Sequence, residues 1–112
     1  LPKVIDAMVK VPDALSLAAM HYLAQRLGRR VGGSSGTNLI GALIAAQQMK
    51  AVGESGSIVA ILCDGGERYA TTYYDQAWLA GQGYELEGLI AAVAASVERG
   101  EPLPNSVLRA NI

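Results

Sequence analysis

A segment rich in glycine and serine constrains the fold of this chain more than any other feature. It reads Val31-Gly32-Gly33-Ser34-Ser35-Gly36-Thr37-Asn38 and is followed by an apolar run over 39–49. Glycines let the backbone turn sharply and approach a ligand closely. The helix that starts here offers unpaired N–H groups, which Thr37 or one of the serines before it is expected to cap. The segment predicts one wall of a small-molecule site, at the carboxyl end of a strand.

A second segment, residues 57–63, predicts a buried strand. It reads Ser-Ile-Val-Ala-Ile-Leu-Cys, without polar alternation, which is typical of a parallel strand covered on both faces. The apolar run over 3–11 predicts another strand or an extended entry. Strand, helix, turn and strand in this order form a βαβ unit. The expected fold class is therefore α/β, with βαβ units of a mostly parallel sheet, helices on both faces, and a larger domain of which this chain is part.

Apolar residues spaced three and four apart predict helices over 14–27, 39–50 and 85–99. Gly28 and Gly100 are expected to end the first and the last of them in the left-handed conformation. Asp13 is the predicted N-cap of the first. The middle helix is apolar around most of its circumference, so we expect it to be buried on more than one side. Residues 70–79 predict a shorter helix.

The composition of the chain limits the classes of function that it can have. The net charge is −1 and no basic run is present, which leaves nucleic-acid binding without support. No apolar run approaches the roughly 18–20 residues of a membrane span. The single cysteine, Cys63, lies in an apolar run, which predicts a core side chain and a reduced, cytoplasmic setting. One histidine and no paired cysteine give no basis for a metal site.

Taken together, these segments resemble a known family. The residues that carry the resemblance are Gly32-Gly33-Ser34-Ser35-Gly36, the helix after them, the apolar run 58–62, and Asp64-Gly65-Gly66-Glu67-Arg68-Tyr69. They look like the C-terminal part of cysteine synthase and cystathionine β-synthase, which are pyridoxal-phosphate enzymes of fold type II. Cys63-Asp64-Gly65 stands where the family often has Pro-Ser-Ser or Pro-Asp-Ser, and the tail from Gly81 matches no part of the family pattern.

The resemblance implies a cofactor site. The first serine of the motif, here Ser34, would hydrogen-bond the pyridine nitrogen of pyridoxal 5′-phosphate. Gly33 and Ser35 would shape the same loop, while Asp64 and Gly65 would approach the ring from the neighbouring strand end. A neutral hydroxyl cannot keep that nitrogen protonated, so the ring becomes a milder electron sink, suited to β-elimination and β-replacement.

The implied activity is β-elimination or β-replacement on O-acetylserine, serine or cysteine through an aminoacrylate, as in cysteine synthase. One alternative is an L-cysteine desulfhydrase that releases sulfide, pyruvate and ammonia. An alternative of another class is a non-catalytic interaction or regulatory fragment that keeps the fold without the chemistry.

None of the three lysines, Lys3, Lys10 and Lys50, lies in the family's Schiff-base motif. We therefore expect residues 1–80 to be the C-terminal part of a large cofactor-binding domain and residues 81–112 to form a C-terminal helix and an irregular tail. The remaining N-terminal part of the same enzyme would supply the lysine, and this chain alone would be inactive. The family also implies a homodimer.

Overall fold

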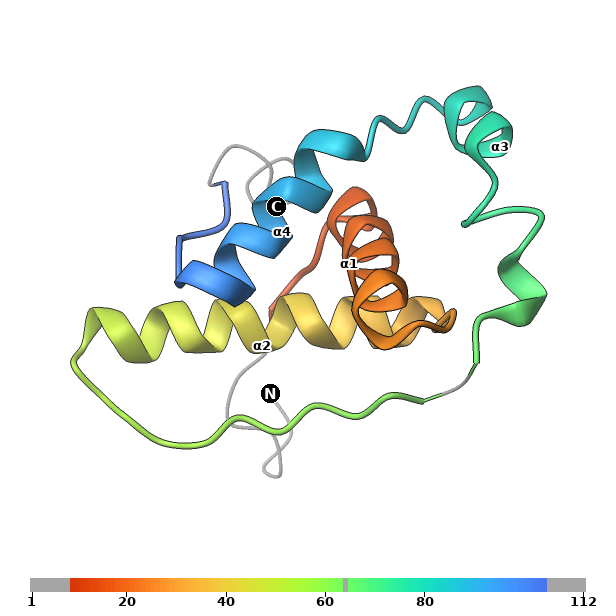
Figure 1. Ribbon diagram of the computed structural model, residues 1–112. Coiled ribbons are helices and arrows are strands. Elements are labelled where there is room, and N and C mark those ends of the chain that lie inside the picture. Colours follow the sequence, from red (N-terminus) through yellow and green to blue (C-terminus); the bar gives the residue numbers. More distant parts are fainter. Residues whose placement is uncertain (1–8, 64, 105–112) are drawn as a thin grey trace.

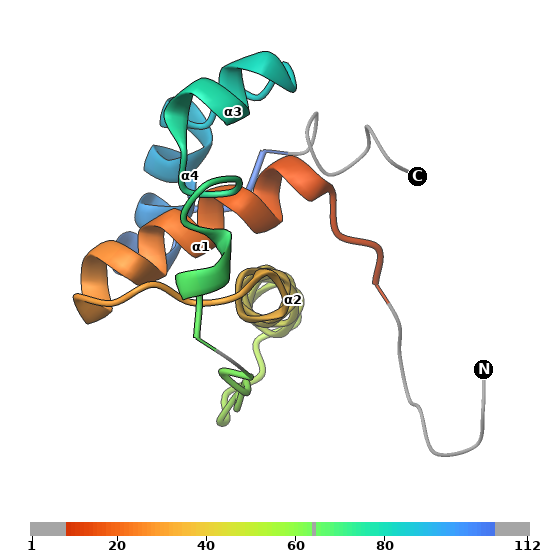
Figure 2. The same cartoon turned by 90° about the vertical axis from the view of Figure 1, so that its right-hand side faces the viewer.

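A computed structural model describes residues 9–63 and 65–104. Its elements are α1 (Asp13–Leu27), α2 (Gly33–Ala51), the short 3-10 helix η1 (Glu67–Tyr69), α3 (Gln76–Gly81) and α4 (Glu87–Arg99). Helices α1 and α4 lie on one side of α2, and the extended chain that follows α2 runs along its other side (Figure 1). The view along α2 in Figure 2 shows the same arrangement.

The predicted parallel sheet is wrong for the part of the chain that the structure describes. No strand is formed there, and the single β contact is an antiparallel bridge between Val31 and Gly65. Residues 57–63 are extended yet unpaired, and Val59 and Ile61 are 91% and 69% exposed. A strand exists only through its backbone partners, and the described residues offer this segment none. The run predicted over 3–11 lies mostly outside the described residues, and 9–11 form no strand.

The helices follow the predicted apolar spacing, but their starts differ. The first and last predicted helices correspond to α1 and α4, and Gly28 and Gly100 close them with φ of 70° and 69°, as predicted. Asp13 is the first helical residue rather than the N-cap, because the capping position belongs to Pro12.

Helix α2 starts six residues earlier than predicted, and it takes most of the glycine- and serine-rich segment into its first turns. Its N-cap is Gly32, and no side chain caps it. The hydroxyl of Thr37 donates instead to the carbonyl oxygen of Gly33, at 3.2 Å. Such a bond back to the preceding turn is common for threonine inside a helix. The predicted side-chain cap is therefore wrong.

Helix α1 is the centre of the packing. Its buried residues join others from α2, α4 and the C-terminal segment in one core cluster: Leu15, Ala18, Ala19, Tyr22, Ile40, Val93 and Leu103. Helices α1 and α2 come closest at Gly36, where an added Cβ would collide with the backbone oxygen of Ser16 and lie 2.8 Å from the Met20 side chain. The absence of a side chain at Gly36 thus sets how α1 crosses the start of α2.

The buried positions of α2 are Ser35, Gly36 and Ile40. The expectation that this helix is buried on more than one side is wrong for the described residues, because most of its other apolar side chains are only half-buried. Among the described helices, none is long and apolar enough to cross a membrane.

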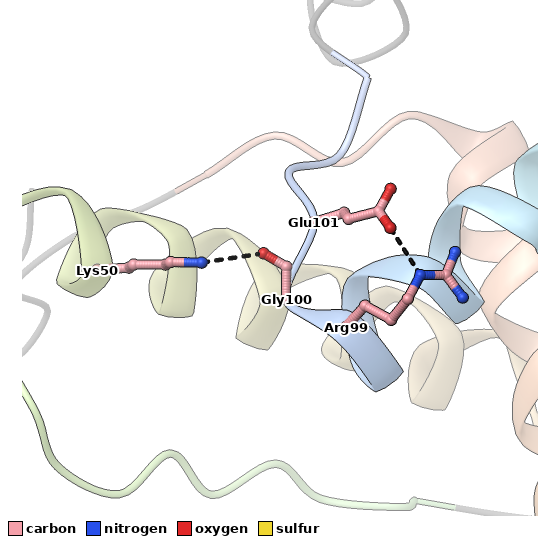
Figure 3. A network of polar contacts seen from close by, with 4 residues as sticks. All are labelled: Lys50, Arg99, Gly100 and Glu101. Atoms are coloured by element: carbon pink, nitrogen blue, oxygen red, sulfur yellow. Dashed lines mark hydrogen bonds and ion pairs between the residues drawn. The ribbon is translucent and has the colours of Figure 1, made fainter.

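The C-terminal ends of α2 and α4 meet in a small polar network (Figure 3). The ammonium of Lys50 donates to the carbonyl oxygen of Gly100 at 3.4 Å, and Nε of Arg99 lies 2.6 Å from a carboxylate oxygen of Glu101. The Arg99 and Glu101 side chains are more than half exposed. Exposed pairs of this kind contribute little to stability, so apolar packing holds these helices together.

Candidate functional site

The start of α2 and the end of the extended segment lie side by side, although about 30 residues separate them in sequence. The amide of Cys63 donates to the hydroxyl of Ser35 at 3.2 Å, and the amide of Gly66 donates to the carbonyl oxygen of Arg30 at 3.1 Å. The bridge between Val31 and Gly65 lies between these two contacts. The two halves of the motif on which the predicted site rests are therefore neighbours in space.

Gly66 makes this close approach sterically possible. An added Cβ there would collide with the carbonyl oxygen of Val31 and lie 2.7 Å from its backbone nitrogen. At Gly65 an added Cβ would instead meet the end of the Glu67 side chain, which can move away. Gly66 was not among the predicted site residues, although its place beside Gly65 in a Gly-Gly pair was a usable signal.

The two serines of the motif face different surroundings. Successive side chains of an α-helix point about 100° apart. Ser35 is 1% exposed and accepts the bond from Cys63. Ser34 is exposed, and no described residue forms a hydrogen bond with its side chain. Its hydroxyl is thus available to a ligand, whereas that of Ser35 is already used within the protein.

Gly33 adds a second open position beside Ser34. It is half-buried, and a Cβ built on it would lie 3.7 Å from the Tyr73 ring. A cavity of about 360 Å³ opens next to it, lined in part by Asp13, Trp78 and Tyr84. The backbone at Gly33 thus leaves room that a larger side chain would fill, whereas the end of the Glu67 side chain occupies the corresponding space at Gly65. Asp64, the remaining predicted contact, lies outside the described residues.

Tyr74 fastens the entry to α2, and sequence reasoning missed it. Its hydroxyl donates to the carbonyl oxygen of Val31 at 2.7 Å and accepts from the Val31 amide at 3.0 Å. Val31 is fully buried, so the hydroxyl satisfies two backbone groups that water does not reach. Burial, as the largest cause, raises the pKa of the Tyr74 phenol above its usual value near 10. No local pattern links two residues 43 positions apart.

The aromatic residues of η1 and of the segment after it form a packed wall beside the site. The rings of Tyr69 and Tyr73 stack at 4.9 Å, and Trp78 meets Tyr73 edge-on at 5.7 Å. Nε2 of His21 lies 2.7 Å from the Tyr73 carbonyl oxygen, which ties the wall to α1. These rings pack around a second buried cluster, formed by Leu17, Met20, Val31, Leu79 and Leu86.

Two further side-chain expectations concern metal ligands and Cys63. The described residues contain no group of three histidine, cysteine, aspartate or glutamate side chains that could hold a metal ion. Cys63 is exposed, so its prediction as a core side chain is wrong. The segment that carries it lies on the outer side of α2 rather than inside a sheet (Figure 2).

Comparison with known proteins gives the ancestry of this arrangement. Over 93 residues the chain is 50% identical to the L-cysteine desulfhydrase Cds1 of Mycobacterium tuberculosis, a stretch that covers 83% of this chain and 25% of that protein. It is 36% identical to a cysteine synthase of Dictyostelium discoideum over 69 residues, covering 62% of the chain and 18% of that protein. A cystathionine β-synthase of the same organism is 33% identical over 82 residues, covering 73% and 16%.

The chain belongs to the cysteine synthase and cystathionine β-synthase family. This confirms the resemblance found in the two glycine motifs and places the chain among pyridoxal-phosphate enzymes of cysteine metabolism. The chain spans about a quarter or less of the length of these relatives. No family model matches it.

Proposed function

We propose that this chain forms one wall of the cofactor site in a longer pyridoxal-phosphate enzyme. The observation that supports the proposal is the pairing of the two motif segments at Val31 and Gly65, together with the exposed side chain of Ser34 at the start of α2. Ser34 has no hydrogen-bond partner among the described residues, and Gly33 has no side chain to obstruct a flat ring. At Gly65 the flexible end of the Glu67 side chain lies where a Cβ would stand. These features fit the pyridine side of pyridoxal 5′-phosphate.

In this proposal each residue has a limited task. Ser34 faces the pyridine nitrogen, Gly33 leaves space for the ring, and Asp64 and Gly65 approach the ring from the other segment. When bound, the cofactor supplies an electron sink for amino-acid chemistry. The Ser34 hydroxyl is neutral and leaves that sink mild, which favours loss and replacement of a β-substituent. The proposed substrates are O-acetylserine, serine or cysteine. Another part of the enzyme supplies the Schiff-base lysine, and the complete enzyme is a cytoplasmic homodimer.

Net breakdown of cysteine is a second candidate reaction. The 50% identity to a protein named L-cysteine desulfhydrase exceeds the 36% identity to the Dictyostelium cysteine synthase. The two reactions are separated by assaying the complete enzyme with cysteine alone, and then with O-acetylserine plus sulfide. Sulfide and pyruvate from cysteine alone support breakdown, whereas cysteine formed in the second assay supports synthesis.

The cofactor assignment is tested by Ser34→Ala in the complete enzyme, with the exposed loop residue Ser55 changed to alanine as the matched control. We expect Ser34→Ala to fold normally, to shift the absorbance of the bound cofactor and to reduce turnover, while Ser55→Ala changes neither. Unchanged spectra and kinetics in Ser34→Ala would remove Ser34 from the site. A complete protein that binds no pyridoxal phosphate would favour the non-catalytic alternative.

A further inference from the structure

The end of the extended segment is attached to α2 by two hydrogen bonds from neighbouring helical positions. Ser35 accepts from the Cys63 amide at 3.2 Å, and the side-chain amide of Asn38 donates to the Ile61 carbonyl oxygen at 2.9 Å. Ser35 and Asn38 are three residues apart, so they lie on one face of the helix. Residues 61 and 63 are two apart in extended chain, so the same side of that segment meets the helix.

These two bonds matter because the described part of the chain offers the segment few other polar contacts. Residues 57–63 form no ladder with any described residue, and all seven are exposed. The Asn38 amide also lies 3.8 Å from Sγ of Cys63. Beyond Cys63, the bridge at Gly65 and the Gly66 amide hold the chain against 30–31. Among the described residues, the side chains of Ser35 and Asn38 therefore supply the hydrogen bonds from α2 that hold the segment as it reaches the site.

We propose that Ser35 and Asn38 are positioning residues that clamp the end of this segment against the first turns of α2. The clamp fixes the distance between the Ser34 hydroxyl and the backbone at Gly65, and it rests on the proposed function for its effect on the cofactor. In this assignment the two adjacent serines have different roles. Ser34 contacts the cofactor, and Ser35 holds the opposite side of the site in place.

The test uses the complete enzyme loaded with pyridoxal phosphate and two clamp variants. Ser35→Ala removes the acceptor. Asn38→Asp keeps the shape of the side chain but removes the donor. Amide hydrogen exchange of a peptide covering 57–66 is measured beside the apparent affinity for pyridoxal phosphate and the separate values of kcat and KM. Thr37→Ala is the matched control, because it removes a hydroxyl from the same helical turn. That hydroxyl bonds Ser16 and Gly33 and not the extended segment.

We expect exchange in 57–66 to rise about five- to tenfold in each clamp variant, as the loss of one net hydrogen bond predicts, and cofactor affinity to fall severalfold. Thr37→Ala should leave exchange in 57–66 unchanged. Ser35→Thr, which keeps the hydroxyl, should restore slow exchange. If amide exchange in 57–66 is unchanged in both clamp variants, the clamp proposal is overturned. This holds even if the complete protein binds pyridoxal phosphate as proposed. Faster exchange in a complete protein that binds no pyridoxal phosphate supports the clamp and contradicts the proposed function instead.

Discussion

The hydroxyl of Tyr74 bonds both backbone groups of Val31, donating to its carbonyl oxygen at 2.7 Å and accepting from its amide at 3.0 Å. One side chain thereby satisfies both backbone groups of Val31, whose pairing with the described residues is otherwise limited to the isolated bridge with Gly65. Val31 lies two residues before α2, so Tyr74 holds the backbone just ahead of the helix that carries Ser34.

Replacing Tyr74 by phenylalanine removes both bonds while keeping the ring. Two backbone groups of the fully buried Val31 would then lack partners, and each buried polar group left unpaired costs about 1–3 kcal/mol. We expect Tyr74→Phe to lower the free energy of unfolding of the complete protein by at least that amount in denaturant titration. Tyr84→Phe is the control, since no described residue hydrogen-bonds the Tyr84 hydroxyl. Equal stability of the two variants would contradict this role for Tyr74.

The same bond predicts a loss of stability at alkaline pH. Burial raises the pKa of Tyr74 above 10, so the folded state favours the protonated phenol. Its stabilising contribution is then complete below a pH of about 10 and is lost as the pH rises through the raised value. We expect the stability difference between the native protein and Tyr74→Phe to narrow above that pH in unfolding measurements. A constant difference up to strongly alkaline pH would rule out this titration.

The crossing of α1 and α2 predicts opposite effects for two glycines of one helix. Alanine at Gly36 would collide with the backbone oxygen of Ser16, while Gly41 has no atom near an added Cβ. Overpacking of this kind costs typically about 1–3 kcal/mol, whereas glycine to alanine in an open helix position gains about 0.5–1 kcal/mol. Thermal unfolding of Gly36→Ala and Gly41→Ala in the complete protein is the measurement. Stabilisation by both would mean that the crossing is not as close as the structure has it.

The exposed apolar segment predicts that this chain is poorly folded when isolated. Val59 is 91% exposed, Ile61 69% and Leu62 44%, and contiguous apolar surface of this kind ordinarily marks an interface. We expect the 112 residues expressed alone to unfold over a broad temperature range in circular dichroism. A sharp, cooperative melt would show that this prediction is wrong.

Apolar spacing predicted the helices well, because a helix satisfies its own backbone and needs only a buried face. It predicted α1 and α4 to within two residues, and Gly28 and Gly100 marked their ends correctly. The prediction of a paired strand over 57–63 was wrong for the opposite reason. Its lack of polar residues indicated contact with something apolar, but a strand also needs backbone partners, and no pattern within seven residues supplies those.

The candidate site was likewise predictable only in part. The family motifs predicted that the start of α2 and the chain around Gly65 share one site, and the structure brings them together. The contacts of Ser34, Gly33, Ser35, Asp64 and Gly65 with a cofactor stay predictions. Tyr74 and Gly66 were missed because their roles depend on Val31, which is distant in sequence and adjacent only after folding.

The bonds around Val31 and Ser35 also have a consequence for the order of assembly. Their partners, Cys63 and Tyr74, follow them by 28 and 43 residues, and loops of this length must close before the contacts form. Helices α1 and α2 can pair while the chain is still short, but the start of α2 gains its contacts with Cys63 and Tyr74 only when that later part of the chain returns to it. The proposed site would thus form late in folding, and a chain that stops after α2 would carry every residue of the serine motif without the contacts that surround it.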